Sequence, residues 1–290
     1  MVKPPAKNLQ KTAVHPIPAP DFNLQLTLDS GQVFHWRPSG LGYSGVIGVT
    51  PVHVQQAGDQ LLTTGDPAVV SRYFALDHPL PAIYRSFPND PAMAAALDYC
   101  RGMRIIRQPA WECLATFITS SMKQVAHIAQ ISNTLRTRYG EPAGAHHAYP
   151  VPERLASLNE ADLRACALGY RARNLLKTAR MIAEGEVSLE AIRTMDDDNA
   201  RAELCRLGGV GEKVANCVLL FAYERVRAFP IDVWIERVLR EHYFKGKRKI
   251  TASRLRDFSR EYFGRYGGYA QQYLFHHARS AKRAARKIPS

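Results

Sequence analysis

The stretch that decides the fold is Leu207–Cys217, LGGVGEKVANC, in which three of four consecutive positions are glycine. Glycine readily adopts positive φ angles and carries no side chain that would keep a phosphate at a distance. The apolar residues that follow have the spacing i, i+3, i+4 and i+7 of one helix face; they are Val214, Cys217, Val218 and Phe221. Residues 200–207 also predict a helix. The stretch therefore predicts a helix-hairpin-helix whose backbone amides can bind a nucleic-acid phosphate.

Two ionisable side chains suggest chemistry at this hairpin. Lys213 lies in the first helical turn, where the helix dipole disfavours its positive charge, so it is suited to act as an amine nucleophile and form a Schiff base. Nineteen residues later, in Phe229–Trp234, FPIDVW, Asp232 could move protons or stabilise a cationic sugar. The alternatives are a solvated lysine that contacts phosphate and an aspartate that only caps a helix beginning at Val233. Because hairpin, lysine and Pro-x-Asp occur together, we favour catalysis.

This combination closely resembles the helix-hairpin-helix (HhH-GPD) DNA glycosylases, and within them the lysine-bearing 8-oxoguanine DNA glycosylase/AP lyases. The resemblance implies that Lys213 attacks C1′ of the sugar and expels the damaged base. It implies that Asp232 supports the transition state and later proton transfers, and that Gly209, Val210 and Gly211 hold the DNA backbone.

The composition is that of an ordinary globular protein with a surplus of basic residues. Of 290 residues, 46% are hydrophobic and 22% are charged, and the formal net charge is +13 with a pI near 9.7. This charge favours nucleic acid as the partner, because each phosphate contact releases counterions. Residues 240–290 hold fourteen Lys or Arg and three Asp or Glu, and a solvated basic tail is the simpler explanation for the last dozen residues.

The sequence carries no pattern typical of a secreted, membrane or metal-binding protein. The N-terminus lacks the apolar core of a signal peptide and no apolar run reaches eighteen residues. We therefore expect a cytoplasmic protein, nucleoid-associated in a bacterium or nuclear in a eukaryote, with no membrane contact. The five cysteines show no C-x-x-C spacing, so we expect no metal and no other cofactor. We also expect a monomer.

The N-terminal part predicts an α+β domain. Residues 1–20 are rich in Pro and Lys and are expected to be flexible, and residues 21–100 to form an antiparallel sheet domain with helices. Phe22–Leu28 alternates apolar and polar residues, as a half-buried strand does. Further strands are expected at 32–37, 42–49, 52–56 and 60–64, and helices that pack on the sheet at 67–74 and 91–100.

Residues 101–290 predict a mostly α-helical region, which the resemblance divides into two subdomains with the lesion pocket between them and a basic C-terminal tail. Pro109 is placed as a helix start, and residues 111–121 are apolar on nearly all sides, which predicts a buried helix. A second helix is expected to end at Tyr139. A flexible loop over 140–152 and short helices over 153–158 and 160–167 should follow.

A segment near the N-terminus also resembles the family. Ser30–Arg37, SGQVFHWR, is similar to the family's Ser-Gly-Gln-x-Phe-x-Trp-Arg. The resemblance implies that the carbonyl of Gly31 accepts a hydrogen bond from N7–H of 8-oxoguanine, a hydrogen that guanine lacks. A buried polar group left unmet costs about 1–3 kcal/mol, which discriminates between the two bases. Without the resemblance, Gly31 is an ordinary turn glycine.

The C-terminal match is Gly268–Phe275, GYAQQYLF, which places Gln271 and Phe275 one helical turn apart, so that both can face one cavity. The resemblance implies that Gln271 binds the Watson–Crick edge, that Phe275 stacks on the base and that Cys217 packs on the other side. Cys217 also shares a helix face with Lys213. From the pattern alone, Phe275 and Cys217 are core residues.

The side that meets the opposite strand departs from the family. Leu168–Arg173, LGYRAR, matches, which implies that Tyr170 wedges into the duplex and Arg171 contacts the orphaned base. A structural tyrosine at a helix start is the alternative. Where the family has a run of Asn and then an Arg, this chain has Met122-Lys123-Gln124 and His127. Trp234 also replaces a common His. We therefore expect altered reading of the opposite base.

The sequence thus predicts a bifunctional DNA glycosylase/AP lyase that flips 8-oxoguanine out of duplex DNA, releases it through Lys213 and nicks the strand by β-elimination. Two alternatives stay open. One is a glycosylase for alkylated purines, which has no need of a lysine nucleophile, and the other is a non-catalytic helix-hairpin-helix DNA-binding protein.

Overall fold

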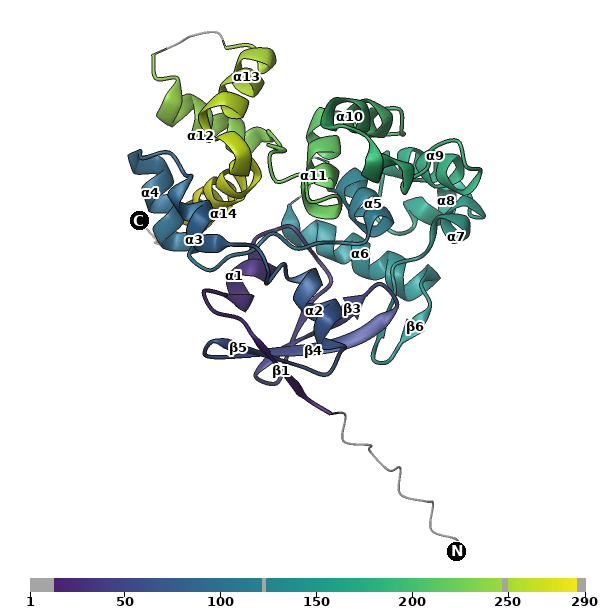
Figure 1. The fold of residues 1–290 in the computed structure, drawn as a ribbon. Coiled ribbons are helices and arrows are strands. Elements are labelled where there is room, and N and C mark those ends of the chain that lie inside the picture. The colour runs from purple at the N-terminus through teal and green to yellow at the C-terminus, as the bar shows by residue number, and fades with distance from the viewer. Residues whose placement is uncertain (1–12, 122–123, 247–249, 286–290) are drawn as a thin grey trace, which may run out of the picture.

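The computed structural model describes residues 13–121, 124–246 and 250–285. It has the predicted α+β fold: a five-stranded antiparallel sheet lies at one end, and most of the helices are gathered above it (Figure 1). The strands follow the order β1-β5-β4-β3-β2 across the sheet. They are β1 (His15–Pro18), β2 (Arg37–Ser39), β3 (Gly42–Ile47), β4 (Thr50–Ala57) and β5 (Gln60–Thr63).

Strands β3, β4 and β5 lie where the alternating pattern predicts them. Their register places Val54 of β4 opposite Tyr43 of β3 on one side and Thr63 of β5 on the other. Val52 and Val54 are two residues apart and both buried, because alternate side chains of a strand point to one face. Helix α2 (Pro67–Tyr73), also as predicted, packs its Val70 into this core.

The strand predicted at Phe22–Leu28 was wrong, because this segment forms helix α1 (Leu24–Asp29). The side chain of Asn23 caps the helix by accepting a hydrogen bond from the Leu26 amide at 2.9 Å. Leu24, Thr27 and Leu28 are its buried residues, and they follow helical spacing. Three leucines at every second position resemble a strand, but the asparagine cap and the helical burial decide otherwise.

The strand predicted over 32–37 was also largely wrong, since only Arg37 belongs to β2. The buried carboxamide of Gln32 instead donates to the Arg104 carbonyl and accepts from the Ile106 amide, each at 2.8 Å. This bonding ties the chain to a distant segment rather than to a neighbouring strand. Conversely, His15–Pro18 was expected to be flexible and instead forms edge strand β1, in which Ile17 is buried.

The helices above the sheet form two groups. One surrounds α5, the buried helix expected after Pro109, and the other surrounds the long helix α14. The first group consists of α5 (Ala110–Ser120), α6 (Val125–Tyr139), α7 (Pro152–Ala156), α8 (Glu160–Arg164), α9 (Arg171–Ala183), α10 (Asp197–Cys205) and α11 (Glu212–Ala222). The second consists of α3 (Leu80–Arg85), α4 (Pro91–Cys100), α12 (Val233–Tyr243), α13 (Ala252–Tyr262) and α14 (Gly267–Ala285). Short 3-10 turns lie at Ala191–Thr194 and Gly264–Tyr266.

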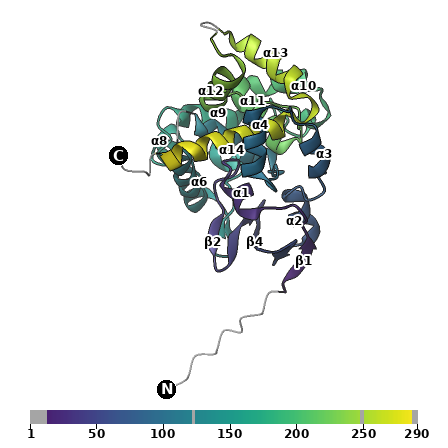
Figure 2. The same cartoon turned by 90° about the vertical axis from the view of Figure 1, so that its left-hand side faces the viewer.

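Helix α4 was correctly predicted, but the expectation that it packs on the sheet was wrong. It lies against α14, as Figure 2 shows, with Met93, Ala96 and Cys100 buried in the helical core. Small residues on one face of α4 allow α14 to approach closely. Because α14 is distant in sequence, the local pattern of α4 could not identify it as the partner. The loop expected over 140–152 also contains a short hairpin, β6 (Pro142–Ala143) and β7 (His146–His147).

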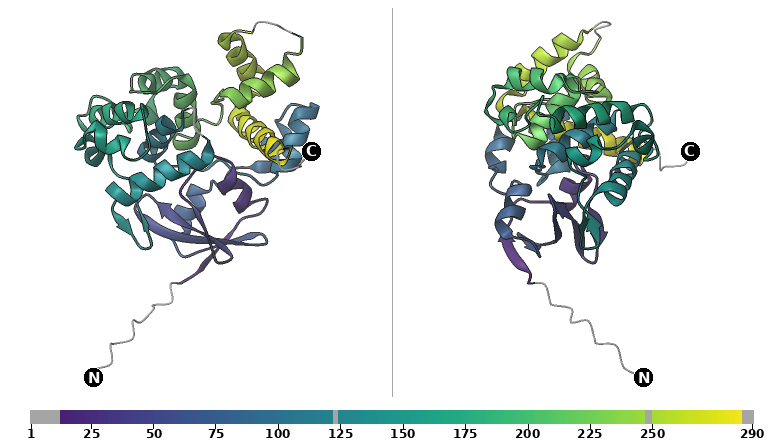
Figure 3. Two further views of the ribbon diagram at one scale, coloured as in Figure 1. Left: turned by 180° about the vertical axis from the view of Figure 1, so that it is seen from behind. Right: turned by 90° about the vertical axis from the view of Figure 1, so that its right-hand side faces the viewer.

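Viewed from behind, α14 of the second helical group lies near α1, and its Gln272 donates to the Ser30 carbonyl that follows α1 (Figure 3). Residues from both ends of the chain are thereby brought together. Among the described residues, no helix is both long and apolar enough to cross a membrane.

Candidate active site

The hairpin between α10 and α11 is shaped by close packing on α9. A side chain on Gly208 or Gly209 would collide with Asn174, and Gly209 also has a φ of +77°. The Thr178 hydroxyl donates to the Gly208 carbonyl at 3.0 Å. Gly211 differs from the other two glycines, because a side chain there would meet no atom within 4 Å. Packing therefore explains two of the glycines, and the third leaves open space at the start of α11.

The start of α11 is suited to bind an anion. Its N-cap is Gly211, and no side chain caps the helix. The first amides of a helix have no partner within the helix, so those of α11 are available to a phosphate. The Val210 side chain is buried and its amide donates to the Leu207 carbonyl at 3.2 Å, which stabilises the turn. The predicted phosphate contacts of Gly209, Val210 and Gly211 stay predictions.

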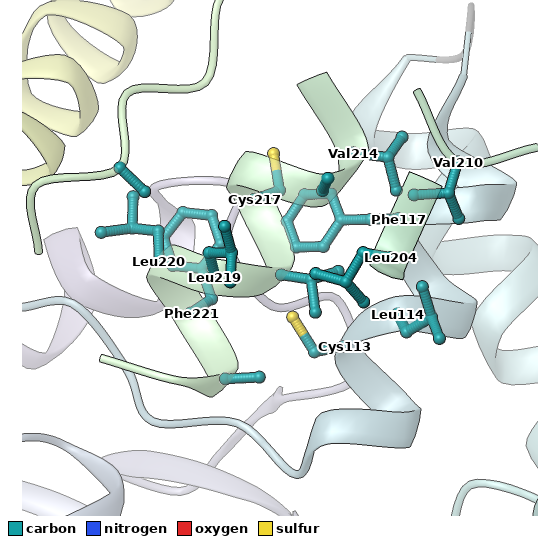
Figure 4. Close-up of a cluster of buried hydrophobic side chains, with 14 of the residues drawn as sticks. Cys113, Leu114, Phe117, Leu204, Val210, Val214, Cys217, Leu219, Leu220 and Phe221 are labelled. Carbon is teal, nitrogen blue, oxygen red and sulfur yellow. The ribbon is translucent and has the colours of Figure 1, made fainter. Parts of the chain in front are cut away.

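Lys213 lies beside three groups that define its surroundings. Its Nζ is 5.2 Å from the centre of the Phe117 ring, which belongs to α5. Figure 4 shows Phe117 lying close to Cys217 and Val214 of α11. Burial raises the pKa of the Cys217 thiol to about 11, while the nearby Lys213 ammonium lowers it and the Asp232 carboxylate raises it. The structure thus brings Lys213, Cys217 and Asp232 together, although 19 residues separate the lysine from the aspartate.

Asp232 does cap α12, as the simpler interpretation held. Its Oδ1 accepts from the amides of Trp234 and Ile235 at 3.0 and 2.9 Å. Its other oxygen, Oδ2, accepts no hydrogen bond from the described residues. The cap therefore orients the carboxylate through one oxygen and leaves the second for another group, so capping and catalysis are compatible.

Hydrogen bonds from three side chains to backbone carbonyls hold the turn around Gly31. Arg279 donates to the Asp29 carbonyl, Gln272 to that of Ser30 at 3.0 Å, and Gln108 to that of Gln32 at 2.7 Å. Among the described residues, no donor reaches the carbonyl of Gly31 itself. Gly31 has a φ of +88°, which disfavours any other residue. Three neighbouring carbonyls are thus bonded around one that is left as a free acceptor.

Helix α14 supplies two of the residues that are predicted to surround the base. Gln271 is only 4% exposed, and its Oε1 is buried without a hydrogen-bond partner among the described residues. A buried acceptor of this kind is unfavourable unless a ligand meets it. One turn later, the Phe275 ring lies against Gly31: a side-chain carbon placed on Gly31 would be 3.3 Å from Phe275 Cε1. The structure therefore makes neighbours of Gly31 and Phe275, which are distant in sequence, and their contacts with a base stay predictions.

The residues expected at the opposite strand lie elsewhere, at the start of α9. Tyr170 is 55% exposed, while Arg171 is 5% exposed and donates through Nε and Nη2 to the Ser121 carbonyl. Its guanidinium also lies 4.3 Å from the Tyr170 ring. His127 is exposed near the start of α6, and Met122 and Lys123 lie outside the described residues. Arg171 would have to leave Ser121 to reach an orphaned base, so its predicted role stays a prediction.

Several residues of the site escaped the sequence-based prediction. Gln108, Gln272 and Arg279 hold the Gly31 turn, and Phe117 faces the Lys213 amine. Arg279 carries a recognisable signal, because it follows Phe275 at the same four-residue spacing that joins Phe275 to Gln271. The two glutamines had no signal, since nothing local distinguishes a glutamine that bonds a distant carbonyl from one on the surface.

Comparison with known proteins shows which family the chain belongs to. Residues 14–114 match the N-terminal domain of 8-oxoguanine DNA glycosylase, and residues 115–263 match the HhH-GPD superfamily of base excision DNA repair proteins. The chain belongs to the 8-oxoguanine DNA glycosylase family of the HhH-GPD superfamily. The HhH-GPD match contains Lys213 and Asp232, and the N-terminal match contains Gly31. Gln271 and Phe275 lie beyond both matches, so the structure is what connects them to the site.

Two relatives match this HhH-GPD protein over most of both chains. A probable N-glycosylase/DNA lyase of Methanothermobacter thermautotrophicus is 31% identical over 91% of this chain and 95% of its own length. The 8-oxoguanine glycosylase/lyase of Clostridium acetobutylicum, solved with double-stranded DNA containing cytosine opposite 8-oxoguanine, is 30% identical with a TM-score of 0.85. That similarity covers 93% of this chain and 98% of the other. A 3-methyladenine DNA glycosylase of Archaeoglobus fulgidus shares the fold, with a TM-score of 0.74. It is 20% identical, and the similarity covers 91% of this chain and 98% of the other.

Proposed function

We propose that this protein is a DNA glycosylase/AP lyase that binds double-stranded DNA, removes 8-oxoguanine and then nicks the strand. The observation that carries the proposal is the grouping of Lys213 with Cys217 and Asp232 beside the Phe117 ring. The Gly31 carbonyl and the buried Gln271 Oε1, which no described residue meets, are proposed to receive the base. We also propose that the protein acts as a monomer. Light scattering of the free protein and of its DNA complex tests the monomer.

The two acceptors define the base. A purine that satisfies both must offer donors on its imidazole edge and on its Watson–Crick edge. 8-oxoguanine has N7–H on the first edge and N1–H with an amino group on the second. Guanine and adenine alkylated at N3 both lack the N7 hydrogen, so neither can donate to the Gly31 carbonyl. An acceptor that a bound base leaves unmet costs about 1–3 kcal/mol, so this carbonyl favours the oxidised guanine over both.

The chemistry follows from Lys213. Its neutral amine attacks C1′, the C1′–N9 bond breaks, and the base leaves with the electron pair and takes up a proton. Loss of the ring oxygen from C1′ then gives a Schiff base between the sugar and Lys213, the oxygen being protonated. Removal of a C2′ proton expels the 3′ phosphate and nicks the strand. Asp232, oriented by its bonds to Trp234 and Ile235, provides the negative charge near the cationic sugar.

Trapping with borohydride tests the proposal. Borohydride reduces a Schiff base to a stable amine, so incubation with a duplex containing 8-oxoguanine opposite cytosine should crosslink the parent protein to DNA. A Lys213→Gln variant should give no crosslink. Base release without a crosslink would indicate an alkylated-purine type of glycosylase that uses water, and binding without base release would indicate a non-catalytic DNA-binding protein.

A further inference from the structure

Arg279 contacts Gly31 and Phe275, two of the residues that are predicted to surround the damaged base. It follows Gln271 and Phe275 at four-residue intervals on α14, so the three side chains share one face of the helix. The centre of its guanidinium lies 5.3 Å from the centre of the Phe275 ring. A side-chain carbon placed on Gly31 would run into Nη1 of Arg279 and lie 3.5 Å from its Cζ. The guanidinium therefore fills the corner between the ring and the turn.

Hydrogen bonds fix the guanidinium in this corner. Nη2 donates to the Asp29 carbonyl at the end of α1 and lies 3.2 Å from Nδ1 of His276. Burial and the charge of Arg279 lower the pKa of His276 to about 4, so at neutral pH the imidazole is uncharged and its Nδ1 accepts the bond. A basic side chain at the end of a helix also satisfies a carbonyl that has no partner within the helix. Arg279 thus connects α14 with a residue 250 positions earlier.

Three anchors hold the turn, and they differ in what else they touch. Gln272 and Gln108 bond the carbonyls of Ser30 and Gln32. Of the three, Arg279 is the one that also lies over the Phe275 ring. Gln272 and Arg279 both join the turn to α14, and of the three anchors Arg279 is the one in direct contact with both the turn and the ring.

We propose that Arg279 is a positioning residue that sets the Gly31 carbonyl relative to the Phe275 ring and thereby determines the preference for 8-oxoguanine over guanine. The proposal rests on the function proposed above. A base stacked on the ring presents N7 to the carbonyl only if both are held within about 0.5 Å of the productive geometry. Hydrogen bonds weaken steeply outside 2.7–3.2 Å, so a small displacement of the turn removes the term that distinguishes the lesion.

Binding measurements on two matched duplexes test this role. We would use full-length protein carrying Lys213→Gln, which cannot cleave, and duplexes identical except for 8-oxoguanine or guanine opposite cytosine. The measured quantity is the dissociation constant for the guanine duplex divided by that for the 8-oxoguanine duplex. Adding Arg279→Met should lower this ratio about tenfold, because it weakens binding of the lesion duplex alone. Arg279→Lys should lie between, because an ammonium can still donate to Asp29 but is not a flat group that stacks on the ring.

Lys282→Met is the matched control. It removes a positive charge from the same helix, but the Lys282 amine lies 5.1 Å from the Trp234 ring, away from the Gly31 turn. It should weaken binding to both duplexes equally and leave the ratio unchanged. A loss of selectivity as large as that of Arg279→Met would show that charge alone is responsible and would overturn the proposal.

An unchanged ratio in Arg279→Met, with the melting temperature of the parent, would also overturn it. If Arg279→Met melts at a lower temperature than the parent, Arg279→Gln is the variant to measure. Its amide keeps a donor for the Asp29 carbonyl and loses the cation over the Phe275 ring. A ratio in Arg279→Gln equal to that of the parent then refutes the positioning role. A parent protein that binds both duplexes equally refutes the proposed function itself, which is a distinguishable outcome.

Discussion

The two sides of the site differ in how their polar groups are used before DNA is bound. On the side predicted to receive the lesion, the carbonyls next to Gly31 are bonded, while Gly31 and the buried Gln271 present acceptors that no described residue meets. On the side predicted to meet the opposite strand, the arrangement is reversed. Arg171 is buried against the Ser121 carbonyl, whereas Tyr170 and His127 are exposed.

This difference indicates where selectivity arises. A rigid turn with one free carbonyl imposes its full penalty on a base that lacks a donor, because the turn cannot move to relieve it. An arginine that must first leave a carbonyl gains only the difference between its old and new hydrogen bonds. We therefore expect strong discrimination of the damaged base and weak discrimination of the base opposite, and the following experiments test that contrast.

The largest effect is expected from Lys213→Gln on the lesion side. The variant should lose base release and strand nicking by more than about 10³-fold, since the nucleophile is gone. DNA binding should survive, because the start of α11 and the basic surface are unchanged. Single-turnover assays with a binding titration measure both. The same substitution at the exposed Lys245 is the control, and full glycosylase activity in Lys213→Gln would refute the mechanism.

Asp232→Asn should have the next largest effect. The amide oxygen can still accept from Trp234 and Ile235, so the melting temperature should stay within a few degrees of the parent. The negative charge near the sugar is lost, and turnover should fall by about 10²–10³-fold. Parallel melting and single-turnover experiments separate the two roles: cleavage at the parent rate would leave Asp232 as a helix cap only.

Phe275→Ala probes the stacking surface and should weaken capture of the lesion by about 1–3 kcal/mol. The half-buried ring also contacts the Gly31 turn, so thermal stability must be measured alongside. The concentration at which single-turnover rates saturate on lesion duplex reports capture. Unchanged saturation together with normal stability would place Phe275 outside the pocket.

The smallest effect is expected at the opposite base. His127 supplies at most one ring donor when neutral, and Met122 cannot donate a hydrogen bond, so we expect cytosine to be read mainly by Arg171. Excision of 8-oxoguanine opposite cytosine should exceed that opposite adenine, guanine or thymine by a smaller factor than in relatives with the Asn run and both arginines. His127→Ala should change these ratios little. Single-turnover rates on four duplexes measure them, and a strong cytosine preference that persists in His127→Ala would show that other residues read the base.

The sequence alone determined the parts of the protein that depend on local spacing. The glycine hairpin, the helix after it and the helix that begins at Val233 were all predicted, as were strands β3, β4 and β5. Each rests on periodicity or capping within about ten residues, where the backbone geometry of helix and strand dictates the pattern. Lys213 and Asp232 were assigned by the same local pattern together with the family resemblance.

Only the tertiary structure decided what lies between distant segments. It made Leu24–Asp29 a helix, packed α4 on α14 rather than on the sheet, and placed Arg279 on a turn 250 residues away. It also left Gly31 and Gln271 with acceptors that no described residue meets. The physical reason is that hydrogen bonds and packing depend on distance in space, whereas sequence spacing reports only neighbours along the chain, so a free carbonyl and a bonded one are indistinguishable until the chain has folded.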